Sequence, residues 1–207
     1  MIEKWYAVII PAAGESKRFG SNKLLFEYKG KAIIEHTLQT YQNYKEGNFN
    51  IFVILGYEKK GLKKKINNYS VTFVENPEYK TGGMSSSVKK GLIKLKDLDL
   101  TNCQGIFIHP ADIPFITIQV ILTLIKKKEI SSKKIFIPIY KGRRGHPLLI
   151  DKSLINLFMQ VDEESEGMKG ILKKNMRKNI ELIDVTNQMI LFDIDKREDF
   201  FLKNLES

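Results

Sequence analysis

Short apolar runs alternate along the chain with segments in which apolar residues return every three or four positions. The runs have the length of buried strands, and the longer segments have the period of helices with one apolar face. Strands are predicted at about 5–11, 50–55, 71–75, 104–109 and 134–138. Helices are predicted at about 31–45, 57–67, 84–96 and 116–128. This alternation indicates an α/β fold, in which a mostly parallel sheet carries helices on both faces.

The pattern changes after residue 138. Two apolar flanks surround the basic, glycine-containing turn at 141–145, which predicts a hairpin attached to the parallel sheet. Farther on, helices are expected near 152–160 and 165–178, strands near 180–185 and 190–194, and a last helix from 196. No repeat or linker interrupts the 207 residues, of which 43% are hydrophobic, so the chain can bury a large core. The sequence therefore predicts one domain over residues 1–207, with a three-layer, Rossmann-like fold and a C-terminal hairpin insertion.

The net charge of +10 raises the question of nucleic acid as a partner. The lysines are dispersed in short runs such as 63–65 and 126–128, and no zinc spacing, RNA-binding aromatic motif or long basic arm accompanies them. The charge therefore favours attraction of small anions, and no nucleic-acid partner is expected. The chain has no apolar run of about 18 residues, no leader pattern and a single cysteine, Cys103. We therefore expect a cytoplasmic protein without a membrane span or a disulfide.

The first predicted strand runs into a loop in which Gly14 and Gly20 bracket the basic residues Lys17 and Arg18, and Lys23 follows. Glycines let the backbone turn sharply and present amide donors to an anion, and the cations add charge. The loop has neither the ending of a Walker loop nor the three-glycine fingerprint of a dinucleotide site. It predicts a site for a nucleoside triphosphate, and the alternative is a basic surface loop.

A glycine pair, Gly82 and Gly83, precedes Met84 and three consecutive serines at a predicted helix start. Backbone amides and hydroxyls at this position could read the edge of a nucleotide base. Serine is also a preferred N-cap residue, but a cap needs only one. Three serines in a row therefore favour a binding role.

Two carboxylates follow predicted strands, and ligands of open α/β sheets collect at such strand ends. Asp112 lies between two prolines just past the strand at 104–109, and Asp195 follows the strand expected near 190–194. Magnesium prefers one or two carboxylates together with phosphate oxygens and water, so this pair would suffice for a magnesium site. The alternative is helix capping, since the spacing of Asp195 to Glu198 is similar to that of a capping box.

Taken in order, these motifs resemble the molybdenum cofactor cytidylyltransferases, which belong to the MobA-like NTP transferases and have the nucleotide-diphospho-sugar-transferase-like fold. The resemblance spans nearly the whole chain. It rests on the segments 11–14 continuing to Lys23, 83–87, 112–114, 142–147, 164–167 and 193–195. Two positions depart from the family pattern, because Pro11 stands where leucine is common and Ile113 where glutamine or methionine is usual. Neither change removes a charge.

The resemblance implies roles by position. Arg18 and Lys23 would hold the triphosphate and, with Asp112, act in catalysis. Magnesium would be held by Asp112 and Asp195. The nucleotide would contact Ala12, Ala13, Gly14, Gly82, Gly83, Ser85, Ser86 and Ser87. The acceptor would contact the hairpin residues Arg144, Gly145, His146 and Pro147, where an arginine fork suits a phosphate. The alternative for His146 is a turn histidine without a ligand.

The implied reaction is the Mg2+-dependent transfer of CMP from CTP to a molybdopterin-type cofactor, with release of pyrophosphate. A small pocket beside Ala12 and Ala13 favours a pyrimidine over a purine. The resemblance also allows a molybdenum-enzyme client or a chaperone as a protein partner. Rival hypotheses are transfer of GMP to the same cofactor and nucleotidyl transfer to a sugar or polyol phosphate. A rival of another class is a non-catalytic nucleotide sensor or nucleic-acid binder, which would need no pair of metal carboxylates.

Overall fold

The computed structural model describes residues 3–44, 48–160, 167–174 and 177–202. All five strands predicted before residue 138 are present. They are β1 (Trp5–Ala12), β4 (Phe49–Leu55), β5 (Thr72–Glu75), β6 (Cys103–Ile108) and β7 (Ile135–Tyr140). The four predicted helices between them are also present, as α1 (Ile33–Gln42), α2 (Lys59–Lys65), α3 (Gly83–Lys96) and α4 (Ile118–Ile130).

The C-terminal third adds two antiparallel strands, β8 (Arg143–Arg144) and β9 (Leu148–Ile150), and one further parallel strand, β10 (Ile180–Asp184). Its helices are α5 (Ile155–Phe158), α6 (Gly167–Lys174) and α7 (Asp199–Leu202). The eight-stranded sheet has the order β10-β7-β9-β6-β1-β4-β5, with β8 paired to β7. Strand β1 is parallel to both β4 and β6, and β10 is parallel to β7, whereas β9 is antiparallel to β6 and β7.

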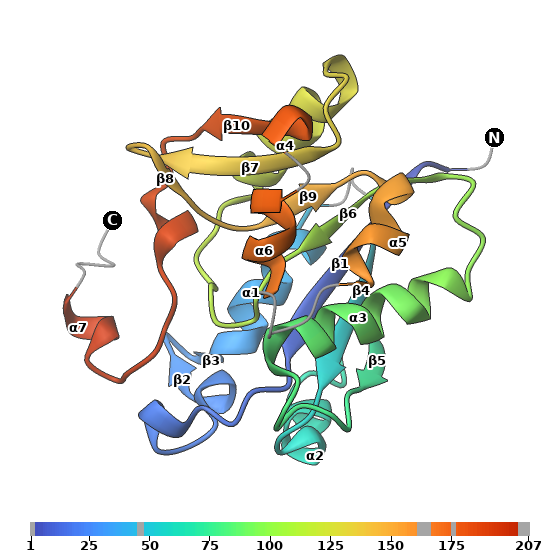
Figure 1. The fold of residues 1–207 in the computed structure, drawn as a ribbon. Helices are drawn as coiled ribbons and strands as arrows, with labels where there is room; N and C mark the ends of the chain where they lie inside the picture. The colour runs from blue at the N-terminus through green and yellow to red at the C-terminus, as the bar shows by residue number, and fades with distance from the viewer. Residues whose placement is uncertain (1–2, 45–47, 161–166, 175–176, 203–207) are drawn as a thin grey trace.

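Helices cover both faces of this sheet, as Figure 1 shows. Successive side chains of a strand point to opposite faces. In β1, Val8 and Ile10 pack in one core with α1, α2 and α4, whereas Ala7 and Ile9 pack in a second core with α3, α5 and α6. The expected three-layer α/β fold is confirmed. None of the helices in the described part of the chain has the length and apolar character needed to cross a bilayer.

The strand expected near 190–194 is wrong. Gln188–Leu191 form a 3-10 helix, capped by the Asn187 side chain, which accepts a hydrogen bond from Met189 N at 2.8 Å. Phe192 and Ile194 are buried, and this i, i+2 spacing imitates the period of a strand. Ile194 N instead donates to Asp112 O at 3.0 Å, so the segment joins a loop.

Other boundaries differ by a few residues. The helix expected from 31 begins at Ile33, because Lys31 belongs to a small hairpin, β2 (Glu27–Tyr28) and β3 (Lys31–Ala32), that the sequence did not reveal. The helix expected at 152–160 is a 3-10 turn at 152–154 followed by α5, and the last helix starts at Asp199. The helix expected at 165–178 is α6 in its described part. The 164–166 part of the family motif lies outside the described residues.

Candidate active site

A charged cavity of about 230 Å³ lies at the carboxyl ends of β1 and β6. It brings together groups that are far apart in the sequence. Its lining includes Ala12, Gly14, Arg18, Lys23, Asp112 and Asp195. The carboxyl ends of neighbouring parallel strands meet at one edge of a sheet, which explains why the loop after β1 and the loop after β6 face each other here.

The cations and carboxylates of this cavity form one ion-pair network. Lys23 Nζ lies 2.7 Å from Asp112 Oδ2 and 3.3 Å from Asp195 Oδ1, and Arg18 Nη1 lies 2.8 Å from Asp195 Oδ2. Lys23 is the least exposed of the four side chains, at 13%. The network places two positive groups beside two carboxylates that retain about a quarter of their surface. Such a set can hold both phosphate oxygens and a divalent cation.

The loop after β1 is shaped by two left-handed residues and two short 3-10 helices. Ser16 has φ 53° and Gly20 has φ 78°, and they flank the 3-10 turn that carries Arg18. The Asn22 side chain accepts from Leu24 N at 3.1 Å and caps the second turn, which begins at Lys23. Both cations are thus held at turn positions with fixed backbone geometry. The predicted strand, glycine turn and basic residues are therefore assembled around one cavity.

The serines at the start of α3 have divided environments. Asn76 Nδ2 donates to Ser86 Oγ at 2.8 Å and to Ser87 Oγ at 3.1 Å, and Ser86 Oγ donates to Gly83 O. These two hydroxyls are bonded to Asn76, and Ser85, which is equally buried, lines a second cavity. The N-cap position of α3 is Gly82, so the serines are not N-caps.

Gly82 itself is required by close packing. A Cβ atom at this position would lie 2.5 Å from Ser86 Cβ. Asn76 opens the segment that leads to the glycine pair, and an Asx residue between a strand end and a proline is a turn signal, but the sequence does not predict its bonds to the serines. Its buried side chain ties the segment after β5 to α3, because its Oδ1 also accepts from Glu78 N.

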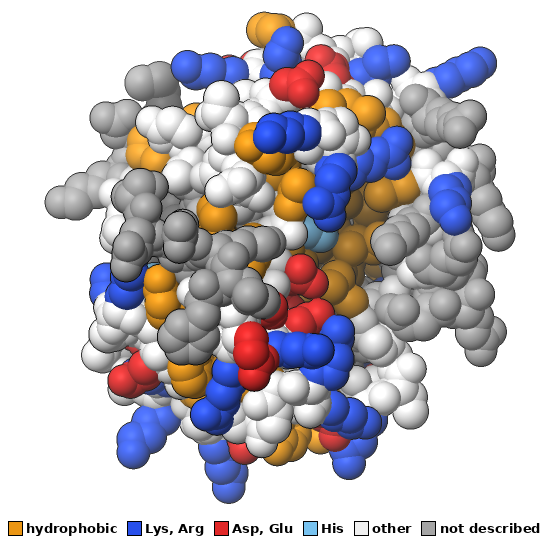
Figure 2. Space-filling view, turned by 90° about the vertical axis from the view of Figure 1, so that its left-hand side faces the viewer, with side chains coloured by type: hydrophobic (Ala, Val, Ile, Leu, Met, Phe, Trp, Pro, Cys, Tyr) orange, Lys and Arg blue, Asp and Glu red, His pale blue; other side chains and the backbone are white. Residues whose placement is uncertain are grey.

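The second cavity, of about 560 Å³, is lined mainly by apolar side chains from α3, β7, β9 and α6. Its lining includes Met84, Ile137, Leu148, Met168 and Leu172, together with Ser85, Arg144, Gly145 and His146. Figure 2 shows a hollow on one face of the molecule with hydrophobic side chains and a histidine on its walls, and acidic and basic side chains beside it. The two cavities thus present different chemistry.

His146 carries a free hydrogen-bonding atom. Its Nδ1 is buried and has no partner among the described residues. Burial lowers the pKa of His146, and the carboxylates of Asp112 and Asp193 oppose that shift, so the ring lies within electrostatic reach of the charged cavity. The Nδ1 atom of a neutral ring in this position can either donate a hydrogen bond to a ligand or accept one from it, depending on the tautomer.

The hairpin leg that carries His146 is fixed on both sides. Gly145 N donates to Pro138 O at 2.8 Å, and His146 N donates to Ile190 O at 2.9 Å. A Cβ at Gly145 would lie 2.5 Å from Ile190 O, so only glycine fits. Pro147 is buried and does not line either described cavity. The same holds for Ala13, whose carbonyl accepts from Tyr57 N at 3.1 Å.

The sequence and the fold both have known relatives. The chain is 24% identical over 193 residues to the molybdenum cofactor cytidylyltransferase of Escherichia coli K12, covering 93% of this chain and 92% of that protein. It is 24% identical over 199 residues to a probable molybdenum cofactor guanylyltransferase of Thermococcus sibiricus, covering 92% and 93%. A shorter match, 32% identical over 118 residues, is to the 2-C-methyl-D-erythritol 4-phosphate cytidylyltransferase of Dictyoglomus thermophilum, covering 57% of this chain and 49% of that protein.

The fold is similar to that of the crystal structure of Rv0371c from Mycobacterium tuberculosis H37Rv, with a TM-score of 0.77, 18% sequence identity, and 96% and 97% of the two chains covered. That likeness concerns the fold alone. The family model of the MobA-like NTP transferase domain matches residues 8–180, which include the loop after β1, the serine segment, Asp112 and the hairpin. The chain therefore belongs to the MobA-like NTP transferase family.

Proposed function

We propose that this protein transfers CMP from CTP to the terminal phosphate of a molybdopterin-type cofactor. In this reaction an acceptor phosphate oxygen attacks the α-phosphorus of CTP. The bond from that phosphorus to the bridging oxygen breaks, and pyrophosphate leaves with the electron pair. No covalent enzyme intermediate is needed, so the protein acts by positioning the two substrates and by neutralising charge.

The observation that carries this proposal is the pairing of a charged cavity, lined by Asp112, with an apolar cavity, lined by His146, whose ring is within electrostatic reach of the Asp112 carboxylate. Lys23 and Arg18 would bind the triphosphate, since both cations line the charged cavity. Arg144 and His146 would orient the acceptor, whose ring system suits the apolar cavity. The family and a full-length relative that is a cytidylyltransferase support this assignment.

The carboxylates Asp112 and Asp195 fit a magnesium ion in their chemistry. Both carboxylates offer oxygen ligands, and both contact the ammonium group of Lys23. The described residues contain no group of three or more His, Cys, Asp or Glu side chains that could hold a metal ion, as a zinc site would need. Magnesium binds through one or two carboxylates plus phosphates and water. Bound there, it would offset negative charge on the phosphates.

A pyrophosphate-release assay with each of the four nucleoside triphosphates tests the proposal. Purified molybdopterin cofactor serves as one acceptor, and 2-C-methyl-D-erythritol 4-phosphate serves as the matched alternative. We expect release with CTP and the pterin acceptor. Preferential use of GTP would show a guanylyltransferase, and use of the sugar-derived phosphate would show the other cytidylyl branch. No release under any condition would favour a nucleotide sensor.

A further inference from the structure

A buried hydrogen-bond chain runs from α1 to the loop that carries Asp112. The Tyr41 hydroxyl lies 2.8 Å from His109 Nδ1, and His109 Nε2 lies 2.9 Å from Ile113 O. Because a carbonyl only accepts, Nε2 carries the proton and Nδ1 accepts from Tyr41. His109 has no exposed surface, and burial lowers its pKa to about 4, so the ring is neutral at neutral pH. Nothing in the proposed reaction uses this histidine directly.

A second contact from the same helix holds the other side of Asp112. Thr37 Oγ1 donates to Ala111 O at 2.8 Å. The carbonyls before and after Asp112 are therefore both held by hydroxyls of α1, one directly and one through His109. Asp112 O in turn accepts from Ile194 N, the residue next to Asp195. The two candidate metal carboxylates are thus tied to one another by backbone and to α1 by side chains.

We infer that Thr37, Tyr41 and His109 are positioning residues that set the carboxylate of Asp112, and through Ile194 that of Asp195, for a divalent cation. This rests on the proposed function, because it takes Asp112 as a metal ligand. Magnesium demands near-ideal octahedral geometry, so its ligands must be held closely. Outer partners of metal ligands typically contribute about 10–100-fold in metal affinity or activity.

Helix α1 also supplies a matched control. Thr40 Oγ1 donates to Ile116 O at 3.0 Å, so it makes the same kind of bond from the same helix to a carbonyl four positions beyond Asp112. Thr37→Val and Thr40→Val each remove one hydroxyl. Only Thr37→Val leaves a carbonyl next to Asp112, that of Ala111, without this hydrogen bond. Tyr69, whose hydroxyl donates to Glu35 at 3.2 Å, gives the control Tyr69→Phe for Tyr41→Phe.

The test measures Mn2+ binding to the full chain from the electron paramagnetic resonance signal of free Mn2+. CTP is present in each sample, and GTP replaces it if the four-nucleotide assay shows that the protein uses GTP. Turnover and urea unfolding are measured beside it. Thr37→Val and Tyr41→Phe should weaken Mn2+ binding about tenfold or more and lower kcat to match, with the KM for nucleotide within about twofold. Thr40→Val and Tyr69→Phe should stay within about twofold of the wild type in both Mn2+ affinity and kcat. Thr37→Ser should bind Mn2+ like the wild type, because it keeps the hydroxyl.

Thr37→Val breaks a buried hydrogen bond and Thr40→Val a part-buried one, so Thr37→Val should lower the urea midpoint at least as much. The unfolding curves must show both variants fully folded under the conditions of the Mn2+ measurement, so that unfolding cannot produce the difference in metal affinity. Equal weakening of Mn2+ binding in these two variants would overturn the inference, as would a wild-type chain that binds no Mn2+ with any nucleotide. If the wild type binds Mn2+ with nucleotide and keeps the difference between the two variants, yet releases no pyrophosphate with any acceptor, the proposed reaction fails and the positioning inference stands.

Discussion

The two cavities of the site differ in the side chains that line them and in the part of the fold that supplies those side chains. The charged cavity is built by loops that follow the parallel strands β1 and β6, and its polar groups are paired with one another. The apolar cavity is built by α3, α6 and the antiparallel strands around the hairpin, and it holds a buried nitrogen, His146 Nδ1, without a partner among the described residues. Phosphates need compensating charge, whereas a ring system is bound by apolar walls and a few oriented polar groups. The difference indicates that nucleotide and acceptor defects should be separable.

The largest expected effect lies in the charged cavity. Asp112→Ala removes a carboxylate that contacts Lys23 and that we assign to the metal, so kcat should fall about 10²-fold or more, the loss typical for one stabilising group in such a site. Steady-state pyrophosphate release measures it. Asp97→Ala, which breaks an exposed pair with Lys94, should leave the rate unchanged. Near-wild-type activity of Asp112→Ala would make Asp112 a structural loop residue only.

The next effect separates the two cavities directly. Lys23→Ala should weaken CTP binding in the absence of acceptor, because it removes the ammonium group that we propose to face the triphosphate. His146→Ala should leave CTP affinity intact and raise the acceptor KM about tenfold or more, since a hydrogen bond to a charged group contributes about 1.5–3 kcal/mol. Calorimetric titration of CTP into both variants decides between them. Equal losses of CTP affinity would mean that the hairpin closes over the nucleotide.

A smaller effect concerns pH and two histidines whose pKa is lowered by burial, His109 and His146. The pKa of His109 is lowered to about 4 by burial, so between pH 6.5 and pH 4 the unfolded chain binds more protons than the folded one. The free energy of unfolding should therefore fall as pH drops through this window, by at most about 1.4 kcal/mol for the first pH unit. His146 adds a contribution of the same sign, because burial lowers its pKa as well.

Urea unfolding at several pH values measures this dependence. His109→Gln and His146→Gln should each flatten the dependence of the unfolding free energy on pH, because each removes one group that must be neutral in the fold. A wild-type free energy of unfolding that stays constant from pH 6.5 to pH 5 would contradict the expectation for both residues.

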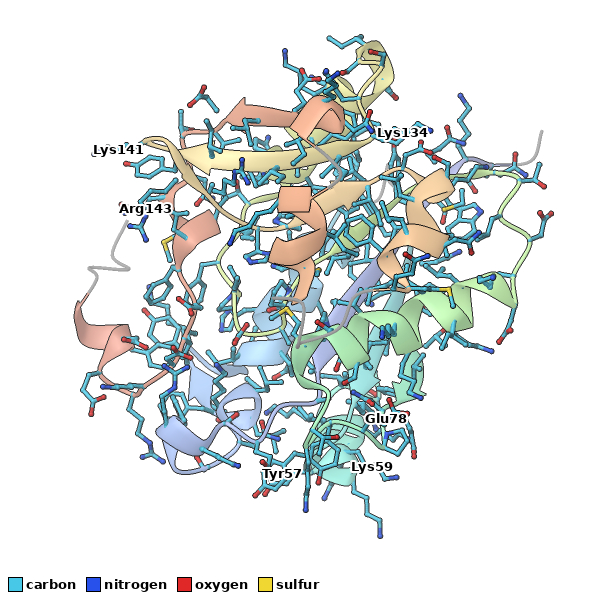
Figure 3. The ribbon with its side chains drawn as sticks, in the orientation of Figure 1. Tyr57, Lys59, Glu78, Lys134, Lys141 and Arg143 are labelled. Atoms are coloured by element: carbon cyan, nitrogen blue, oxygen red, sulfur yellow. The ribbon has the colours of Figure 1, made fainter. Side chains whose placement is uncertain are left out.

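The smallest effect compares two adjacent arginines of β8. Arg144 lines the apolar cavity, whereas Arg143 lies at the outer end of the β7–β8 hairpin beside Lys141, as Figure 3 shows. Arg144→Ala should raise the acceptor KM a few-fold, because one exposed cation beside a phosphate is lost, and Arg143→Ala should change it less than twofold. The acceptor KM of both variants, measured at low and at moderate salt, checks this. If Arg143→Ala has the larger effect, the acceptor lies toward the hairpin tip.

Particular residues show how far the sequence could be read. Apolar runs predicted that Ala12 and Asp112 follow buried strands, and the rule that parallel strands end at one edge of a sheet predicted that they meet. Asp195 lies in the charged cavity, although the strand that was expected to deliver it does not form. The spacing of Phe192 and Ile194 reports burial, and burial at every second residue is not unique to strands. The roles assigned to these carboxylates remain predictions.

The order of strands and helices along the chain before residue 138, apart from the β2–β3 hairpin, was determined by the sequence itself, because apolar period and local turn chemistry are encoded by near neighbours. The order of the motifs along the chain likewise indicated the family. Only the tertiary structure decided which polar side chains are hydrogen-bonded to other protein groups and which face a cavity. Asn76 engages Ser86 and Ser87, and Tyr41 reaches His109 across 68 positions. Such hydrogen-bonded pairs form when helices and loops pack on the sheet, and the two residues of a pair have no fixed spacing along the chain. A hydroxyl or an imidazole has the same local signal whether its partner is a ligand or another side chain, so packing alone settles its role.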